Sequence, residues 1–193
     1  MENINMESGF WINEPKKFTV SNEKIIIITE EKTDFWQRTH YGFRNDNAPA
    51  FLFSTDKEAF SFTVKTAFDS KELYDQCGII IYQNSDNWFK ASIEYENGIY
   101  QRLGSVVTNN GYSDWATTDI DAGISEMYYR LSRKGKDFCL ENSIDGVNFK
   151  QMRIFHLFEA ENEVNIGIYA CSPSNSSFEA VFTEIGLYES IWK

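Results

Sequence analysis

Residues 86–108 read DNWFKASIEYENGIYQRLGSVVT, and this stretch decides the fold. In its first half, Phe89, Ala91 and Ile93 occupy every second position and more polar residues lie between them. This two-residue period is typical of a β-strand with one buried face. The Asn-Gly pair at 97–98 is the preferred centre of a two-residue type I′ turn. The stretch therefore predicts an antiparallel β-hairpin.

A two-residue turn would also fix the register of this hairpin. It sets Glu96 opposite Ile99 and, counting outward, pairs strand 88–96 with strand 99–108. One face then belongs to the core. The other face carries an aromatic ring, two charges and hydrogen-bonding groups, as expected for the floor of a cleft, and its members are Trp88, Lys90, Glu94, Gln101 and Ser105.

Strand-sized segments separated by turn residues continue along the rest of the chain, and no segment of helical length has the period of a helix. The further expected strands are residues 24–29, 51–53, 59–68, 76–83, 127–133, 137–144, 149–157, 164–171 and 178–187. So many strands in one chain favour an all-β fold, a two-sheet antiparallel β-sandwich of the jelly-roll kind. No linker or repeat divides the sequence, so we expect residues 1–193 to form a single domain.

Composition supports this fold and narrows the choice of partners. The chain has 16 Phe, 10 Tyr and 5 Trp, which suit the space between packed sheets. Its 29 Asp and Glu exceed its 18 Lys and Arg, giving a formal charge of −11. Nucleic-acid binding rests on cationic side chains, so we expect no nucleic-acid partner.

The cysteines and the N-terminus bear on localisation. Cys77, Cys139 and Cys171 are widely spaced among apolar neighbours, which favours reduced core thiols over the alternative of one disulfide and one reactive thiol. The first residues have neither a basic nor an apolar region of a secretory signal, and no apolar run is long enough to span a bilayer. We therefore expect a cytoplasmic protein with no membrane partner.

Several motifs resemble a known family. They are YDQCG at 74–78, DNWFK at 86–90, IEY at 93–95, GSVVT at 104–108, SDW at 113–115 and IYACSP at 168–173. In this order they resemble the domain-of-unknown-function family described as "regulation of enolase protein", which belongs to the concanavalin A-like lectin/glucanase superfamily. The resemblance covers roughly residues 9–187. Cys77 and the pair Ile168-Tyr169 depart mildly from the family pattern and concern packing only.

The resemblance implies a curved, concanavalin A-like β-sandwich with a concave face, similar to glucanases, lectins and accessory domains of some xylosidases. It implies no reaction, because the family has no established catalytic residues to transfer. Function inferred from a fold alone is associational, so the site residues must decide.

Binding of a carbohydrate or a related polar small molecule fits the polar hairpin face. Sugars are held by an aromatic ring with polar groups that reach their hydroxyls. The candidate ligand-binding residues are Trp88, Lys90, Glu94 and Gln101, with Asp114 and Trp115 from the following loop and His40 as a rim contact. Alternatively, Lys90 and Glu94 form an ion pair, Trp115 closes a sheet edge and His40 packs within its loop.

Catalysis is a further alternative. Glycoside hydrolysis needs two carboxyl groups about 5 to 9.5 Å apart, and Glu94 and Glu96 share one strand face. Glu96, however, adjoins the turn, where a solvated role is expected. The alternating triple-acid pattern of glucanases is missing. We therefore expect a non-catalytic binding module, with a protein-interaction or regulatory protein in sugar metabolism and a glycoside hydrolase-like enzyme using Glu94 as the alternatives.

We expect no cofactor and no metal. No phosphate-binding glycine loop occurs, and His40 and His156 lack the spacing of a zinc site. Asp119 and Asp121 precede a glycine, which leaves a structural calcium ion as an alternative to two solvated acids.

Overall fold

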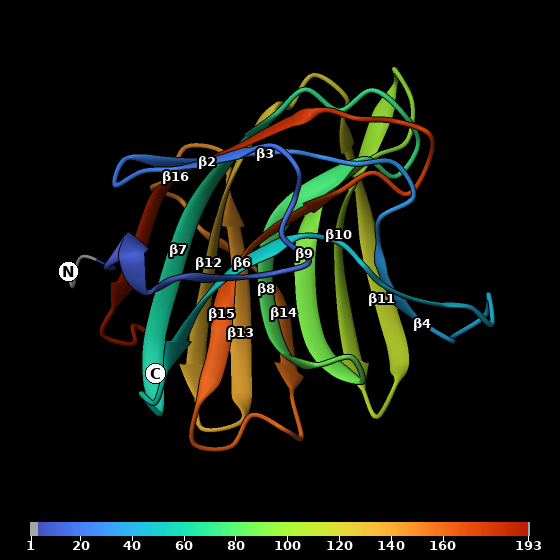
Figure 1. Cartoon of the computed structure of the whole chain (residues 1–193). Coiled ribbons are helices and arrows are strands. Elements are labelled where there is room, and N and C mark those ends of the chain that lie inside the picture. Colours follow the sequence, from blue (N-terminus) through green and yellow to red (C-terminus); the bar gives the residue numbers. More distant parts are fainter. Residues whose placement is uncertain (1–3, 193) are drawn as a thin grey trace.

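Two antiparallel sheets of seven strands each pack face to face in the computed structural model, which describes residues 4–192 (Figure 1). The strands of the first sheet are, in spatial order, β1 (Phe10–Ile12), β6 (Ala50–Thr55), β15 (Val164–Cys171), β8 (Gln76–Asn84), β9 (Asn87–Tyr95), β10 (Tyr100–Asn109) and β11 (Tyr112–Asp121). The strands of the second sheet are β14 (Lys150–His156), β13 (Asp137–Ser143), β12 (Glu126–Lys134), β7 (Ala59–Phe68), β16 (Glu179–Tyr188), β3 (Lys24–Ile28) and β2 (Phe18–Val20). The all-β, two-sheet antiparallel sandwich expected from the sequence is confirmed.

A short hairpin and a single helical turn complete the structure. Strands β4 (Phe35–Gln37) and β5 (Arg44–Asp46) pair only with each other, and η1 (Met6–Ser8) is a 3-10 helix. We call residues 34–46 the flap. Figure 1 shows β4 next to β11, at one side of the sandwich. Among the described residues, no helix has the length and apolar character needed to cross a membrane.

The main core lies between the two sheets. It is built from alternate residues, because successive side chains of a strand point to opposite faces. Phe89 and Ile93 of β9 belong to it, and the Phe89 ring stacks on Phe155 of β14 at 4.0 Å between centroids. This alternation is the one that the sequence predicts for strand 88–96.

A second, smaller apolar cluster lies on the other face of the first sheet. Ile80, Trp88 and Val106 point away from the second sheet and pack with Phe35 and Trp36 of the flap. The strands beneath the flap are thus buried on both faces, which explains their nearly continuous apolar runs, such as the CGIII of β8.

The register of the β9–β10 hairpin differs from the prediction by one residue. Arg102, not Gln101, lies opposite Glu94. The Asn97 side chain accepts hydrogen bonds from the backbone N–H groups of Ile99 (2.8 Å) and Tyr100 (3.2 Å), so the turn holds one residue more than a type I′ turn. This local capping of the turn by an asparagine side chain prevails over the Asn-Gly preference. Each residue of β10 therefore faces the side opposite to the predicted one.

Strand β11 is the main element that the sequence did not indicate. We expected Asp114 and Trp115 in a loop, yet they belong to β11, which pairs with β10 along its full length. Most side chains of β11 are exposed, because it is an edge strand, so it lacks the apolar alternation of the inner strands. The strands expected from residue 127 onward are all present.

All three cysteines lie in this sandwich as buried, free thiols within the described chain. Burial raises the pKa of the Cys171 thiol well above its ordinary value, and that of Cys77 likewise. Both are therefore protonated and unreactive at neutral pH.

Candidate functional site

A cavity of about 220 Å³ lies between the flap and the outer face of the first sheet. The sheet supplies its floor, with Gln76, Lys90, Glu94, Val106 and Trp115. The flap supplies one wall, with Asp34, Trp36, Tyr41, Phe43 and Asn45. Tyr74 and Pro173 complete the lining. Mostly aromatic walls with few polar groups are typical of small-molecule sites.

Lys90 is a buried cation on the floor, and its charge is fully paired. Its Nζ donates to Asp34 Oδ1 and to Gln76 Oε1, each at 3.0 Å. Burial alone would lower the pKa of Lys90, but the neighbouring acidic groups, Asp34 foremost and Glu94 among them, together outweigh burial, and the pKa is raised. Lys90 therefore remains protonated and fixes the start of the flap on the sheet.

Glu94 lies on the same floor but has no such partner. Its side chain is 5 % exposed, and its carboxylate accepts no hydrogen bond of ordinary geometry from the described residues. Burial raises the pKa of Glu94 to about 7, although Lys90 and Arg102 lower it. The Trp115 indole N–H also lowers this pKa by hydrogen bonding toward the carboxylate, although the two groups are not aligned as in an ordinary hydrogen bond. At the cavity, the carboxylate is thus left without a cation bound to it and the indole N–H without a well-aligned acceptor.

Gly104 of β10 lets these two groups approach each other. A Cβ at this position would lie 2.7 Å from Glu94 Oε1 and 3.2 Å from Trp115 Nε1. Both distances are shorter than ordinary contacts, so a larger residue would displace the carboxylate. The glycine in GSVVT therefore shapes the cavity floor.

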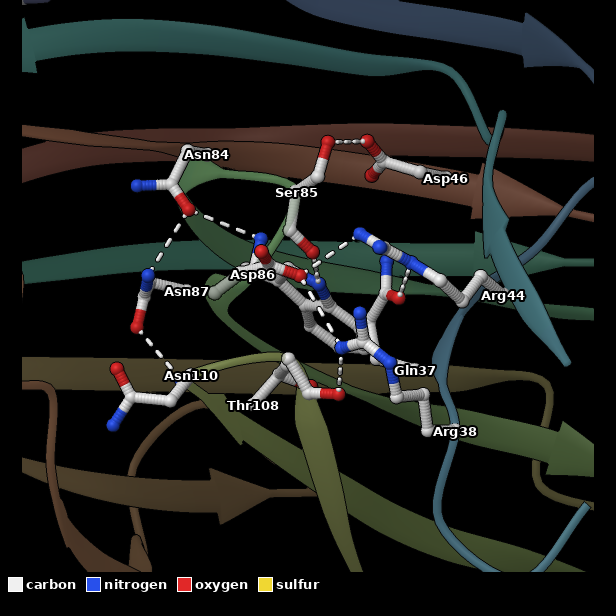
Figure 2. A network of polar contacts seen from close by, with 12 residues as sticks. Gln37, Arg38, Arg44, Asp46, Asn84, Ser85, Asp86, Asn87, Thr108 and Asn110 are labelled. Carbon is white, nitrogen blue, oxygen red and sulfur yellow. Dashed lines mark hydrogen bonds and ion pairs between the residues drawn. The ribbon is translucent and has the colours of Figure 1, made fainter. Parts of the chain in front are cut away.

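The flap is held on the sheet by a polar network that Figure 2 shows from close by. Arg44 Nη2 lies 2.8 Å from Asp86 Oδ1, and Arg38 Nη1 lies 3.6 Å from the same oxygen. Arg38 also donates to the Gly111 carbonyl at 2.8 Å. At the end of the flap, the Tyr82 hydroxyl donates to Asp46 Oδ2 at 2.8 Å. Turns of the first sheet thus hold the flap by its edges.

Removing Asp86 should loosen the flap without unfolding the sandwich. We expect Asp86→Ala to lower the free energy of unfolding by less than about 1 kcal/mol, because Asp86 and Arg44 are partly exposed. Amide hydrogen exchange of the flap should nevertheless become faster, while exchange in β8 and β9 stays unchanged. Glu30→Ala, which breaks the exposed Lys16 pair elsewhere, is the control. Unchanged flap exchange in Asp86→Ala would show that the apolar cluster alone holds the flap.

The structure brings Lys90, Glu94 and Trp115 of the predicted site together at the cavity. Trp88 does not reach it. Its ring is fully buried beneath the flap, 5.8 Å from the Phe35 ring, and its indole N–H donates to the Ser85 carbonyl. The prediction of Trp88 as an exposed sugar platform is therefore corrected, because it fills the second apolar cluster.

The other predicted residues also lie away from the cavity. Gln101 points to the face of the first sheet that lies away from the cavity, as the observed register requires, and its amide donates to the Ile124 carbonyl at 2.6 Å. Asp114 is exposed and pairs with Arg153 of β14. His40 is exposed at the flap tip, with its ring 4.7 Å from that of Tyr41.

The alternatives that used acidic residues also change. Glu96 does not line the cavity but pairs with Arg102, at 3.2 Å between Oε2 and Nε. Asp121 accepts a hydrogen bond from the Gly123 backbone N–H at 2.7 Å. Within the described residues, no group of three or more His, Cys, Asp or Glu side chains could hold a metal ion.

The flap residues of the site were not identified from the sequence. The segment FWQRTHYGF at residues 35–43 could have indicated them, because aromatic residues alternate there with polar ones, as in an aromatic binding loop. Asp34 gave no signal, because its partner Lys90 lies 56 residues away. The contacts of Gln76 are likewise with residues remote in sequence; for example, its Oε1 accepts a hydrogen bond from the Tyr169 hydroxyl at 2.9 Å.

Comparisons with known proteins agree with the fold. The family described as "Protein of unknown function (DUF1349)" matches residues 11–190. "Regulation of enolase protein 1" of Saccharomyces cerevisiae is 31 % identical over 192 residues, covering 100 % of this chain and 95 % of that protein.

Two solved structures give the same result. The crystal structure of a functionally unknown protein from Saccharomyces cerevisiae has a TM-score of 0.89 at 29 % identity, over 97 % of this chain and 100 % of that one. The GH43 protein BlXynB of Bacillus licheniformis has a TM-score of 0.72 at 14 % identity, over 97 % of this chain and 38 % of that one. At that identity, the second likeness concerns the fold alone.

Proposed function

The chain belongs to the DUF1349 family of proteins of unknown function, and on that premise we propose that its cavity binds a carbohydrate or a related polar small molecule without transforming it. The observation that carries this proposal is a poorly satisfied polar pair at the cavity: the buried Glu94 carboxylate, which has no cation bound to it, and the Trp115 indole N–H, which has no well-aligned acceptor among the described residues. Buried polar groups are nearly always fully hydrogen-bonded, so a carboxylate and an indole N–H with only a poorly aligned contact to each other favour a ligand that bonds to both.

A hydroxyl group has the matching chemistry. It donates to a carboxylate and accepts from an indole N–H. The aromatic walls suit the apolar face of a sugar ring, and the Trp115 and Trp36 rings meet edge to face at 6.3 Å. A cavity of about 220 Å³ is smaller than the roughly 300–1,000 Å³ of drug-sized sites, so it suits a ligand of about one ring.

The charges favour binding over catalysis. A glycosidase uses two carboxyl groups that act together on one bond. Asp34 is already paired with Lys90, and Glu96 with Arg102. Glu94 is thus left without a second free carboxyl group among the residues that line the cavity.

A thermal-shift screen of mono- and oligosaccharides, polyols and their amino derivatives tests the proposal. At least one compound should stabilise the protein, by about 2.7 kcal/mol at a hundred times its dissociation constant. We expect Glu94→Gln and Trp115→Phe to weaken this stabilisation. Glu96→Gln and Trp11→Phe, which change the same residue types outside the cavity, should retain it.

Three outcomes would contradict this proposal. Stabilisation that survives both cavity variants would place the ligand elsewhere, and no stabilisation by any compound would remove the binding function. Turnover of aryl-glycosides that Glu94→Gln abolishes would replace binding by catalysis.

Regulation of another protein is the second candidate function. The name of the yeast relative points to enolase as a partner. The flap tip exposes aromatic side chains of a kind enriched in protein interfaces, with Tyr41 51 % and Phe43 45 % exposed. A direct binding assay with enolase, comparing the protein with Tyr41→Ser, tests this candidate. No enolase binding at micromolar concentrations would exclude it.

We also propose a cytoplasmic location. Its support is the set of buried free thiols, Cys77, Cys139 and Cys171, since proteins of oxidising compartments usually pair their cysteines.

A further inference from the structure

The cations around the cavity are already paired, which limits the charge of a ligand. Of the described residues that line the cavity, Lys90 is the one cation, and Asp34 and Gln76 hold its ammonium group. Arg102, which does not line the cavity, lies over the Trp115 ring, 5.7 Å from its centroid, and pairs with Glu96. The described residues thus leave no free cation at the cavity to hold a phosphate or a carboxylate of a ligand.

The uncompensated charge of the cavity is negative. The charged groups that act on Glu94 are Lys90 of β9, Asp34 of the flap and Arg102 of β10, and the neutral Trp115 indole of β11 hydrogen-bonds toward it. Tyr74, just before β8, also faces Glu94 and stays neutral, because burial raises its pKa. Tyr169 and Cys171 of β15 and Tyr129 of β12 stay neutral, because burial raises their pKa values well above the ordinary ones. Asp34 and Lys90 cancel, so an ionised Glu94 leaves one net negative charge. A buried carboxylate without a partner is costly unless a cation joins it.

The aromatic walls add to this preference. The rings of Trp36 and Tyr41 lie 5.5 Å apart and those of Tyr41 and Phe43 lie 5.8 Å apart, with Trp115 on the floor and Tyr74 beside it. The faces of aromatic rings attract ammonium groups within about 6 Å. A neutral sugar would use these rings only by packing, whereas a cation would use both the rings and Glu94.

We propose, on the basis of the binding function above, that the ligand is an amine-bearing polyol, an amino sugar or amino alcohol, whose protonated amine binds the Glu94 carboxylate between the aromatic rings. Its hydroxyl groups would meet the remaining polar groups of the cavity, such as the Trp115 indole N–H and Asn45. The cavity then rejects phosphorylated and acidic sugars, because they would face Glu94 and Asp34 with no free cation.

Matched pairs of probes test this inference by calorimetry or thermal shift. The probes are 6-amino-6-deoxy derivatives of glucose, galactose and mannose, each against its parent hexose, and 3-aminopropane-1,2-diol against glycerol. At least one amine should bind about tenfold tighter than its hydroxyl counterpart. Alkyl amines of this kind stay protonated near neutral pH, as the lysine side chain does.

The pH dependence gives an independent readout. Because the pKa of Glu94 is about 7, its ionised fraction rises about tenfold between about pH 6 and about pH 8, and amine affinity should rise by the same factor. In Glu94→Gln, both the amine preference and this pH dependence should disappear. Glu96→Gln, two residues along the same chain segment, should keep both.

The outcomes separate this inference from the binding function on which it rests. If parent hexoses or glycerol bind as tightly as their amines, the cavity is a polyol site and the amine inference is wrong, while the binding function stands. If amines bind tighter but keep that preference in Glu94→Gln, Glu94 is not their partner and the inference is again wrong. If no probe binds, the inference fails together with the binding function.

Discussion

Glu94→Gln is expected to stabilise the ligand-free protein at high pH. The free energy of unfolding of the variant minus that of the wild type should be roughly 3 kcal/mol larger at about pH 8 than at about pH 4.5. The reason is the burial of Glu94, which raises the pKa of its carboxyl to about 7 from an ordinary value of 4.5. Between these two values, the folded chain binds the proton more tightly than the unfolded chain. The stability contributed by the protonated form is therefore lost as pH rises through this window, and above about pH 7 the folded protein must bury a charge.

Urea denaturation of both proteins across this pH range measures the difference. The free energy of unfolding of the wild type should fall relative to that of Glu94→Gln as pH rises from about 4.5 to 7, and the difference should then level off. Glu96→Gln, whose parent carboxylate is paired with Arg102, is the matched control and should not reproduce this slope. A pH-independent difference between wild type and Glu94→Gln would show that the carboxyl titrates as an ordinary surface acid.

Asp34→Ala is expected to destabilise the protein by about 3 kcal/mol or more. It would leave Lys90 buried without its counter-ion, and removing one member of a buried ion pair usually costs about 3–5 kcal/mol. The same change detaches the start of the flap from the floor of the cavity. Urea denaturation gives the loss, and hydrogen exchange shows whether the flap opens first.

Two control variants sharpen this second prediction. The double variant Asp34→Ala with Lys90→Met should recover most of the lost stability, since it removes the uncompensated charge and keeps the apolar stem. Glu30→Ala, which breaks the exposed pair with Lys16, should change stability little. If Asp34→Ala were as mild as Glu30→Ala, water would have to reach Lys90, and the cavity floor would be far more open than its 3 % exposed lysine indicates.

The sandwich could be predicted because its inner strands carry their own signal. In β9, Phe89, Ala91 and Ile93 all enter the main core, as their alternation predicts. The register could not be predicted from the Asn-Gly pair, because the Asn97 side chain bonds to the turn backbone and lengthens the turn by a residue. One hydrogen-bonding side chain thus decided which face of β10 meets the cavity.

The cavity itself could be predicted only in part. Lys90 and Glu94 were found because strand periodicity puts them on one face of β9, and Trp115 because it follows the hairpin closely. The role of Trp88 was predicted wrongly, because nothing in the sequence of β9 shows that a flap covers its ring. The flap has no periodicity of its own. It is held by contacts such as Arg44 with Asp86 that connect residues far apart in sequence, and these are visible only in three dimensions.

The position of β15 beneath the flap has a consequence for the order of folding. The floor under the flap needs Tyr169 and Cys171 of β15, and Pro173 just beyond it lines the cavity, although the flap itself lies near the N-terminus. During synthesis the flap leaves the ribosome long before these residues do. It therefore has no complete surface on which to dock until most of the chain has emerged, so the cavity is among the last parts of the molecule to assemble.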